Sequence, residues 1–387
     1  MPCAAARRRT LQNGVRLVTP SPLLSPPTHA GSMASAPPAL SYDSERFTKA
    51  TLSASPSLLY NNLSADHSHV AYVHVDQALV VPIASALSGD TVEKRVVISP
   101  EGTVSTYQVR LVTLGAETFF VIATAGGFTI LDGAGKNVLH RQVLPEGKTV
   151  LTSSGAEVAN HARGICTACS ADGRAEICVG SAAGNIFVVE YDGVRFQPST
   201  TIQGGHGGSI TDLGSEVDSF RGSAPAGVEA PRPILVSADD NGAVAVWAAN
   251  SPADFAKLFD VQLKSVVVAV AARGDQIIAA EVSGVVSFVS LATQRVYCEL
   301  QAHGRYLNSM DVHPSRDVFA TVAEDGTIGV WTLPREAREG GEGVGVTENL
   351  FATCWQDGLL TGVAFCGDRG DSLAVCAHDE LGLCVWQ

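Results

Sequence analysis

Short runs of alternating apolar and polar residues recur along most of this chain, and they come in pairs joined by turn residues. The clearest pair is Phe319–Val322 and Ile328–Trp331, which flank the dipeptide Asp325-Gly326. Asp-Gly between two alternating runs is a strong signal for a β-hairpin, because both residues tolerate the backbone angles of a tight turn. The pattern therefore predicts an all-β chain built from hairpins.

Six further hairpins follow the same plan with weaker signals. When Trp247 is aligned on Trp331, the run Ile234–Trp247 superposes on the first hairpin without gaps. Together the seven hairpins place their second runs near positions 79, 130, 188, 246, 288, 330 and 385. An uninterrupted repeat of this kind takes about 40–45 residues. The longer spacings contain the stretches 214–233 and 334–349, whose composition predicts solvated loop insertions.

The best-preserved unit resembles a WD repeat, in which a Gly-His or Ala-His pair opens a blade and a Trp ends its third strand. Here Ala302-His303 opens the unit and Trp331 closes it. The resemblance implies a buried network in which His303 bonds Thr321 and Asp325, and Thr321 also bonds the indole of Trp331. When Trp247 is aligned on Trp331, the unit that His206 opens has the equivalent network residues His206, Ser237, Asn241 and Trp247.

The end of the chain predicts how the ring closes. The last residue but one is Trp386, so the chain stops at the third strand of its last unit. The missing outer strand leaves an exposed edge. The alternating run Arg46–Leu52, upstream of the first unit, is the candidate to fill it. We therefore expect a seven-bladed WD-repeat β-propeller, closed by an N-terminal strand that completes the last blade.

The first 40 residues differ from the rest. They contain four arginines and no acidic residue, with a Pro-, Ser- and Ala-rich stretch from 20 to 38. This composition suits both an organellar transit peptide and a disordered extension. We favour a disordered extension, which is either native or lies upstream of a true start at Met33. The predicted organisation is an extension over 1–40 and a single β-propeller domain over 41–387.

Charge narrows the range of partners. The chain carries 26 basic and 39 acidic residues, a net charge of −13, and four of its arginines lie in the first 40 residues. A strongly acidic domain is unsuited to nucleic acid, whose binding depends on Lys and Arg. No apolar run approaches the ~18 residues that a spanning helix needs. Nine unpatterned cysteines point to free thiols in a reducing compartment, so a cytoplasmic location is expected.

Candidates for chemistry are few. Cys166 and Cys169, with His161 and Cys178 nearby, have the only spacing that suggests zinc. Positions 166 and 169 point to opposite faces of an extended strand, which favours packed thiols over a metal site. No nucleophile–base arrangement is visible. We therefore expect no catalytic residue, no metal and no cofactor.

Several segments resemble the WD repeat-containing protein 54 family. They are Leu59–Ser64, Ala162–Ile165, Ile177–Ser181, Gly205-His206 with Ile210–Asp212, Ser237–Asp240 with Val246-Trp247, Ala302-His303 with Ala323–Asp325, and Phe365-Cys366 with Ser372–Val375. The resemblance covers about residue 41 to the end. It implies a non-enzymatic propeller that acts as a scaffold for protein partners, with self-association possible. A structural subunit of a cytoskeletal or ciliary assembly is a narrower alternative, and an enzyme with a site in the central channel is an alternative of another class.

Partner contacts are expected in the loops that follow each opening His, since these loops rise to one face of the ring. The candidate contact residues are Arg163, Ser209, Arg305 and Tyr306. Arg and Tyr are favoured at the energetic centres of protein interfaces.

Overall fold

The computed structural model describes residues 42–43, 46–89, 95–98, 104–145, 147, 149–151, 155, 157–169, 174–215, 234–334 and 347–387. The expected extension 1–40 lies outside the described residues, as do most of the two expected insertions. Gly214 and Ser215, placed in the first insertion, end a strand, and Asn349, placed in the second, begins one. The residues from Leu40 onward form one compact unit.

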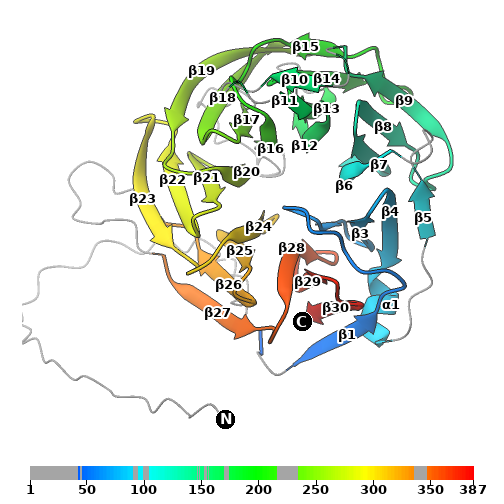
Figure 1. The fold of residues 1–387 in the computed structure, drawn as a ribbon, viewed down its shortest axis with the longest axis vertical. Helices are drawn as coiled ribbons and strands as arrows, with labels where there is room; N and C mark the ends of the chain where they lie inside the picture. Colours follow the sequence, from blue (N-terminus) through cyan, green and yellow to red (C-terminus); the bar gives the residue numbers. More distant parts are fainter. Residues whose placement is uncertain are drawn as a thin grey trace, which may run out of the picture. The chain divides into compact units, whose positions relative to one another are not determined.

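Seven four-stranded antiparallel sheets stand around a central axis like the blades of a propeller (Figure 1). Blade 1 contains β2 (Ser64–Ala65), β3 (His69–His74), β4 (Gln77–Pro82) and β5 (Arg95–Ile98), and α1 (Ile83–Ser88) follows β4. Blade 2 contains β6 (Thr106–Leu114), β7 (Glu117–Thr124), β8 (Gly127–Leu131) and β9 (Val138–Val143). Blade 3 contains β12 (Ala162–Cys169), β13 (Ala175–Ser181), β14 (Ile186–Tyr191) and β15 (Thr200–Ile202).

The remaining blades continue round the ring. Blade 4 contains β16 (Ile210–Ser215), β17 (Ile234–Asp239), β18 (Ala243–Ser251) and β19 (Asp254–Gln262). Blade 5 contains β20 (Val267–Arg273), β21 (Gln276–Glu281), β22 (Val285–Ser290) and β23 (Arg295–Gln301). Blade 6 contains β24 (Leu307–Val312), β25 (Val318–Ala323), β26 (Thr327–Thr332) and β27 (Asn349–Cys354). Blade 7 contains β28 (Leu359–Cys366), β29 (Ser372–His378), β30 (Gly382–Trp386) and β1 (Phe47–Thr51).

The seven-bladed propeller confirms the predicted fold class, including its closure. Strand β1 pairs antiparallel with β30, from Phe47 opposite Trp386 to Thr51 opposite Gly382. The rings of Phe47 and Trp386 lie 5.1 Å apart. The last blade therefore gains its outer strand from the N-terminal side of the ring.

Apolar side chains fill the spaces between neighbouring blades. Between blades 1 and 2, for example, Ala71 and Val73 pack against Phe120 and Ile122, and all four are almost completely buried. Similar clusters lie between other adjacent blades. A single blade cannot bury both faces of its own sheet, so the ring is stable only as an assembled whole.

The inner strands share a β-bulge near their start. The register with the second strand shifts after the first or second residue of the inner strand, which leaves one residue of the inner strand outside the ladder. This occurs in six blades, at Thr106/Gln108, Arg163/Ile165, Ile210/Asp212, Val267/Ala269, Leu307/Ser309 and Leu360/Gly362.

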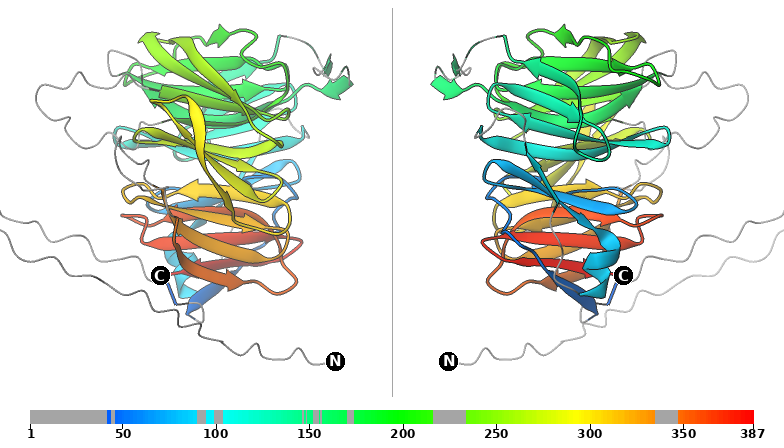
Figure 2. Two further views of the ribbon diagram at one scale, coloured as in Figure 1. Left: turned by 90° about the vertical axis from the view of Figure 1, so that its left-hand side faces the viewer. Right: turned by 90° about the vertical axis from the view of Figure 1, so that its right-hand side faces the viewer.

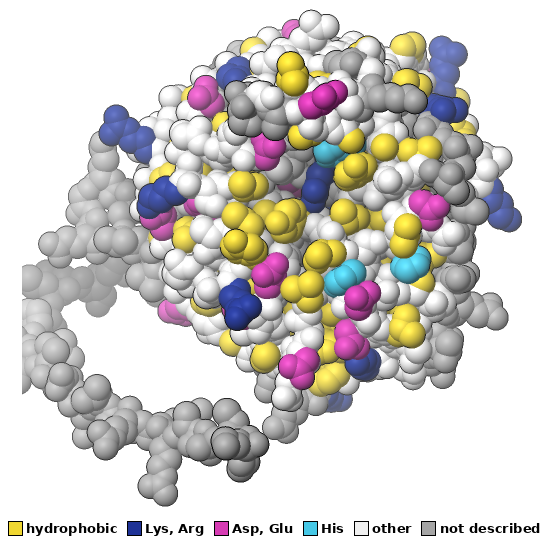
Figure 3. Space-filling model, viewed as in Figure 1, with side chains coloured by type: hydrophobic (Ala, Val, Ile, Leu, Met, Phe, Trp, Pro, Cys, Tyr) yellow, Lys and Arg dark blue, Asp and Glu magenta, His cyan; other side chains and the backbone are white. Residues whose placement is uncertain are grey.

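Connections in each blade alternate between two faces of the ring. The turns between second and third strands, and the segments that link one blade to the next, lie on what we call the upper face. The turns between first and second strands, and between third and fourth strands, lie on the lower face. Figures 1 and 3 look onto the upper face, and the hairpin of β10 (Thr149–Leu151) and β11 (Glu157–Ala159) projects from it in Figure 2.

Candidate functional site

The segment Tyr60–Ser64, which we call the hub segment, lies in the middle of the ring and hydrogen-bonds to all seven blades. Figure 1 shows this part of the chain reaching inward before β2 begins. The bonding partners are Val73 of blade 1, Leu111 of blade 2, Arg163 of blade 3, Asp212 of blade 4, Val268 of blade 5, Asn308 and Met310 of blade 6, and Thr361 of blade 7. The hub segment therefore joins the ring at its centre.

Asn61 makes the largest share of these bonds. Its side-chain Nδ2 donates to Asp212 Oδ2 at 3.1 Å and to the carbonyl of Val268 at 3.0 Å. Its Oδ1 accepts from the backbone N–H of Met310 at 3.3 Å, and its own N–H donates to the carbonyl of Asn308 at 2.9 Å. The residue has φ 52°, a left-handed conformation that Asn tolerates better than most residues. Asn61 thus fits the position in both side chain and backbone.

The neighbours of Asn61 complete the hub segment. The Asn62 amide exchanges bonds with both backbone groups of Val73, and its own N–H donates to the carbonyl of Thr361. Ser64 Oγ accepts from the N–H of Leu111 at 3.0 Å. Asn62 is only 3 % exposed, so the glycosylation sequon Asn62-Leu63-Ser64 is buried in the folded protein.

A cluster of charged side chains lies beside the hub segment. Arg163 donates from a terminal nitrogen to the carbonyl of Tyr60 at 3.0 Å, and its guanidinium lies over the Tyr60 ring. Arg110 of blade 2 approaches Asp212 of blade 4 to 3.9 Å. Burial lowers the pKa of Arg163, while the carboxylate of Asp212 partly restores it. Burial also raises the pKa of Asp212, against the effect of Arg110 and the N–H of Val270. Two cations thus share one carboxylate in a poorly solvated place.

The polar network of blade 6 forms one chain of hydrogen bonds. Trp331 Nε1 donates to Thr321 Oγ1 at 2.9 Å, and Thr321 meets His303 Nε2 at 2.9 Å. On its other side, His303 Nδ1 meets Thr327 Oγ1 at 2.7 Å, and Thr327 donates to Asp325. Asp325 itself is 3.6 Å from Nδ1, too far for the direct bond that we expected. Thr327 therefore carries the contact between His303 and the carboxylate.

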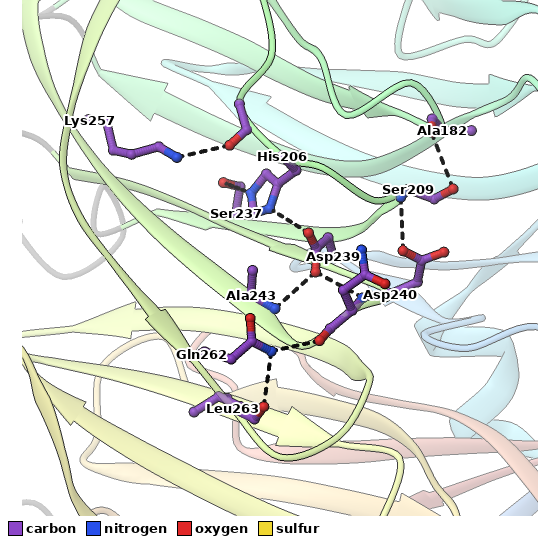
Figure 4. A network of polar contacts seen from close by, with 12 residues as sticks. Ala182, His206, Ser209, Ser237, Asp239, Asp240, Ala243, Lys257, Gln262 and Leu263 are labelled. Atoms are coloured by element: carbon purple, nitrogen blue, oxygen red, sulfur yellow. Dashed lines mark hydrogen bonds and ion pairs between the residues drawn. The ribbon is translucent and has the colours of Figure 1, made fainter. Parts of the chain in front are cut away.

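The network of blade 4 requires a correction to the expected acid partner. His206 Nε2 bonds Ser237 Oγ at 2.6 Å (Figure 4), and Ser237 also accepts from Trp247 Nε1 at 2.8 Å. His206 Nδ1 bonds Asp239 at 3.1 Å, so the assignment of this role to Asn241 is wrong. Burial raises the pKa of Asp239, but the bonds from His206 and from the N–H of Ala243 outweigh it and hold the pKa below its usual range.

The proposed contact residues fall into two groups. Arg163 lies on the inner strand β12 and is bonded to the hub segment, so its placement in an exposed loop is corrected. Ser209 is 8 % exposed, and its hydroxyl donates to the carbonyl of Ala182, so this side chain is mostly buried and hydrogen-bonded within the fold. Arg305 and Tyr306 lie in the segment between β23 and β24 and are exposed on the upper face.

Exposed apolar side chains are unevenly distributed between the two faces. Outside the outer strands, six large hydrophobic side chains of the described residues are exposed. Five of them lie on the upper face: Leu58, Val75, Leu151, Tyr306 and Leu381. Val194, in the turn between β14 and β15, is the one on the lower face. Figure 3 shows hydrophobic side chains gathered around the centre of the upper face.

Three of these upper-face residues are connected by one segment. The N–H of Leu52 donates to the carbonyl of Leu381, and the N–H of Val75 donates to Ser57 Oγ at 2.7 Å. The segment from Leu52 to Leu58 therefore crosses from the turn of blade 7 to the turn of blade 1. It brings Leu58, Val75 and Leu381 onto the same part of the upper face.

The cysteines considered for zinc lie in a strand pair. Cys166 on β12 stands directly opposite Cys178 on β13, and the hydrogen bond between their thiols, together with burial, raises the pKa of Cys178. Among the described residues, no group of three or more His, Cys, Asp or Glu side chains is placed to hold a metal ion. Seven of the cysteines in the described segments are free thiols: Cys166, Cys178, Cys298, Cys354, Cys366, Cys376 and Cys384. No helix within these segments is long and apolar enough to cross a membrane.

His313 gives the stability of the ring a dependence on pH. The imidazole of His313 is fully buried, and its Nδ1 accepts hydrogen bonds from the N–H groups of Ser315 and Arg316 at 3.1 Å. Burial, aided by the charge of Arg316, lowers the pKa of His313 from 6.5 to about 4. Because the folded-state pKa lies below the unfolded value, this stabilisation is complete above pH 6.5 and is lost as the pH falls towards 4.

We expect His313 to account for about 2 kcal/mol or more of the stability lost on acidification, since one pKa unit corresponds to about 1.4 kcal/mol. Denaturant unfolding of the wild type and of His313→Asn, between pH 7 and pH 4, measures this share. Asn keeps an acceptor for the two N–H groups but does not titrate, so its curve should be flatter. Equal slopes for the two proteins would contradict this assignment.

Sequence reasoning missed the hub segment and Asp239. The only sign of the hub segment was that Leu59–Ser64 is not explained by a generic blade. A polar Asn-Asn pair between two leucines, just before the first blade, was the available signal. Asp239 is the last residue of β17, two positions before Asn241, and an alignment on Trp without gaps passed over it.

Comparison with known proteins places this geometry in a family. The family model described as WDR54 matches residues 48–384. The chain is 26 % identical over 342 residues to WD repeat-containing protein 54 of Mus musculus, covering 85 % of this chain and 94 % of the relative. It is 27 % identical over 342 residues to WD repeat domain 54 of Rattus norvegicus, with the same coverage.

Solved structures share the fold at low sequence identity. A chain of the Mitotic Checkpoint Complex superposes with TM-score 0.63 at 16 % identity, covering 93 % of this chain and 99 % of that one. The WD40 propeller domain of Doa1 gives TM-score 0.58 at 14 % identity, covering 88 % of this chain and 97 % of that one. These likenesses show the propeller fold, and the match of the family model over almost the whole ring shows that the chain belongs to the WDR54 family.

Proposed function

We propose that this protein is a non-enzymatic scaffold that binds protein partners through its upper face. The observation that carries the proposal is the concentration of exposed Leu58, Val75, Leu151, Tyr306 and Leu381 on that face. Apolar side chains gathered on one side of a soluble protein mark interaction surfaces. Arg305 and Tyr306 are proposed as contacts, because both residue types are common at energetic centres of interfaces. The overall net charge of −13 supports a protein partner over a nucleic acid.

An enzyme with a channel site predicts converging charged residues, and Arg110, Arg163 and Asp212 do converge. Their bonds favour a structural role, however. Asp212 Oδ2 already accepts from Asn61 and from the N–H of Val270, and Arg163 donates to the hub segment. We therefore propose no catalytic residue and no cofactor. The free thiols of the described residues support a reducing compartment such as the cytoplasm.

Substitution of the apolar residues tests the upper face. Leu58→Asp combined with Tyr306→Asp should reduce the recovery of principal protein partners, crosslinked in the native cell and quantified by mass spectrometry, by about tenfold or more. This corresponds to two energetically important contacts of roughly 1 kcal/mol each or more. Both residues are more than half exposed, at 56 % each, so the fold should be unaffected.

Val194→Asp is the matched control, because Val194 is 87 % exposed but lies on the lower face. It should leave partner recovery as in the wild type. Partners retained by the upper-face variant and lost by Val194→Asp would reject the upper face in favour of the lower one.

A further inference from the structure

Hydrogen-bond donors outnumber acceptors in the charged cluster beside the hub segment. Among the described residues, Arg110 Nε, Arg163 Nε and Gln108 Nε2 have no hydrogen-bond partner. Gln108 is only 2 % exposed. Buried donors are nearly always satisfied in folded proteins, because an unsatisfied one loses its bonds to water without replacement. Three unsatisfied donors stand against one unsatisfied acceptor, Asp212 Oδ1, so this chain supplies fewer acceptors than donors at this place.

These donors come from two neighbouring inner strands. The N–H of Gly164 on β12 donates to Gln108 Oε1 on β6 at 2.9 Å, so the Gln108 amide lies against the residue that follows Arg163. Arg110 is two residues further along β6 and reaches to 3.9 Å from Asp212. The charge of Arg163 interacts with those of both Arg110 and Asp212. The three donors therefore belong to one group of interacting side chains on β6 and β12.

The charges are also unbalanced. Arg110 and Arg163 carry two positive charges against the one carboxylate of Asp212, and that carboxylate already accepts two N–H bonds at Oδ2. A buried charge without full compensation is unfavourable. The Arg110 side chain is 23 % exposed and that of Asp212 is 3 % exposed, so the cluster can be reached from solvent at Arg110.

Aromatic side chains form a wall near the cluster. The rings of Tyr107 and His161 stack with centroids 4.1 Å apart. His161 Nδ1 bonds the carbonyl of Ala159 at 2.8 Å, and burial lowers the pKa of His161, which disfavours the charged imidazolium. The wall thus adds no negative charge, and the guanidinium groups remain the dominant charges.

We propose that this cluster is a binding site for a singly charged oxyanion of the carboxylate or monobasic phosphate class, held by Arg110, Arg163 and Gln108. Guanidinium groups bind the paired oxygens of such anions with strong, charge-assisted hydrogen bonds. Asp212 repels anions of higher charge, which sets the preference for one negative charge. The oxyanion comes either from a free small molecule or from the side chain of a bound peptide.

Thermal unfolding of the full chain tests the site. The melting temperature is compared in sodium chloride, sodium acetate and sodium phosphate at pH 6 and constant ionic strength. At anion concentrations well above the dissociation constant, acetate or phosphate should raise the melting temperature by about 2–4 °C relative to chloride. A blocked glycyl-glutamyl-glycine peptide, assayed in the same way, tests the side-chain source.

Arg110→Gln is the principal variant, because among the described residues Arg110 makes one ion pair, at 3.9 Å to Asp212, and its side chain is 23 % exposed. It should lose the anion effect. Arg195→Gln is the control, since Arg195 is 78 % exposed and ion-paired with Asp192 far from the channel. It should respond as the wild type does.

Binding of ¹³C-labelled acetate, followed by NMR line broadening with the wild type and Arg110→Gln, gives a second readout that does not depend on unfolding. Arginine-dependent binding of any one of the three probes supports the site, and the probe that binds identifies the source. Absence of binding by all three, or equal binding by Arg110→Gln, overturns the proposal.

Discussion

Replacing Asn61 with Ala is expected to lower the unfolding free energy of the ring by about 4 kcal/mol. The change removes three buried hydrogen bonds and leaves the carbonyl of Val268 and the N–H of Met310 without their side-chain partner. Each such loss costs about 1–3 kcal/mol. The partners belong to blades 4, 5 and 6, so the substitution weakens the contacts between the hub segment and blades that are distant from it in sequence. Denaturant unfolding followed by tryptophan fluorescence measures the loss.

Two variants separate the causes of this effect. Asn61→Gly removes the same side chain but accepts φ 52° without strain, so its loss relative to wild type isolates the hydrogen bonds. Asn137→Ala removes an exposed Asn whose amide donates to Asp132 at 2.6 Å, and it should cost about 0.5 kcal/mol or less. If Asn61→Ala costs no more than Asn137→Ala, the hub segment does not hold the blades together.

The blades were predictable because each one repeats a local pattern. Alternation and turn residues such as Asp325-Gly326 act over fewer than fifteen residues, so every hairpin carries its own signal even where His and Trp are lost. The closing strand was predictable for a related reason. Blade 7 takes three strands from the segment after blade 6, the last of them ending at Trp386, and the alternating run before the first blade supplies the fourth.

The site was less predictable because its contacts join residues far apart in sequence. Asn61 and Met310 are 249 positions apart, and no local pattern connects them. Arg163 was placed in a loop because it follows His161 closely, whereas the chain there has already entered the inner strand β12. In blade 4, the carboxylate came from the end of a strand instead of from the turn. Contacts between side chains of different blades form only in the closed ring, and the sequence of a single repeat does not specify them.

Closure by β1 leads to the second large effect. A variant that begins at Ser53 lacks β1 and the buried side chains of Ala50 and Leu52, which are 0 % and 2 % exposed. It should lose about 5 kcal/mol or more, from roughly 2–3 kcal/mol of apolar burial and several backbone hydrogen bonds of about 1 kcal/mol each. Strand β30, which carries Trp386, then becomes an exposed edge prone to association. A lower melting temperature and a tendency to aggregate are the expected results.

Hydrogen exchange shows which strands lose protection in the truncated variant. The backbone amides of Gly382–Trp386 should exchange much faster in this variant, while those of β18 in blade 4 change less, because blade 7 loses its outer strand directly. A variant that begins at Tyr42 keeps β1 and serves as the control. A synthetic peptide of residues 42–52, added in excess to the variant that begins at Ser53, should restore protection of β30. Unchanged exchange at β30 after truncation would show that pairing with β1 contributes nothing to the closed ring.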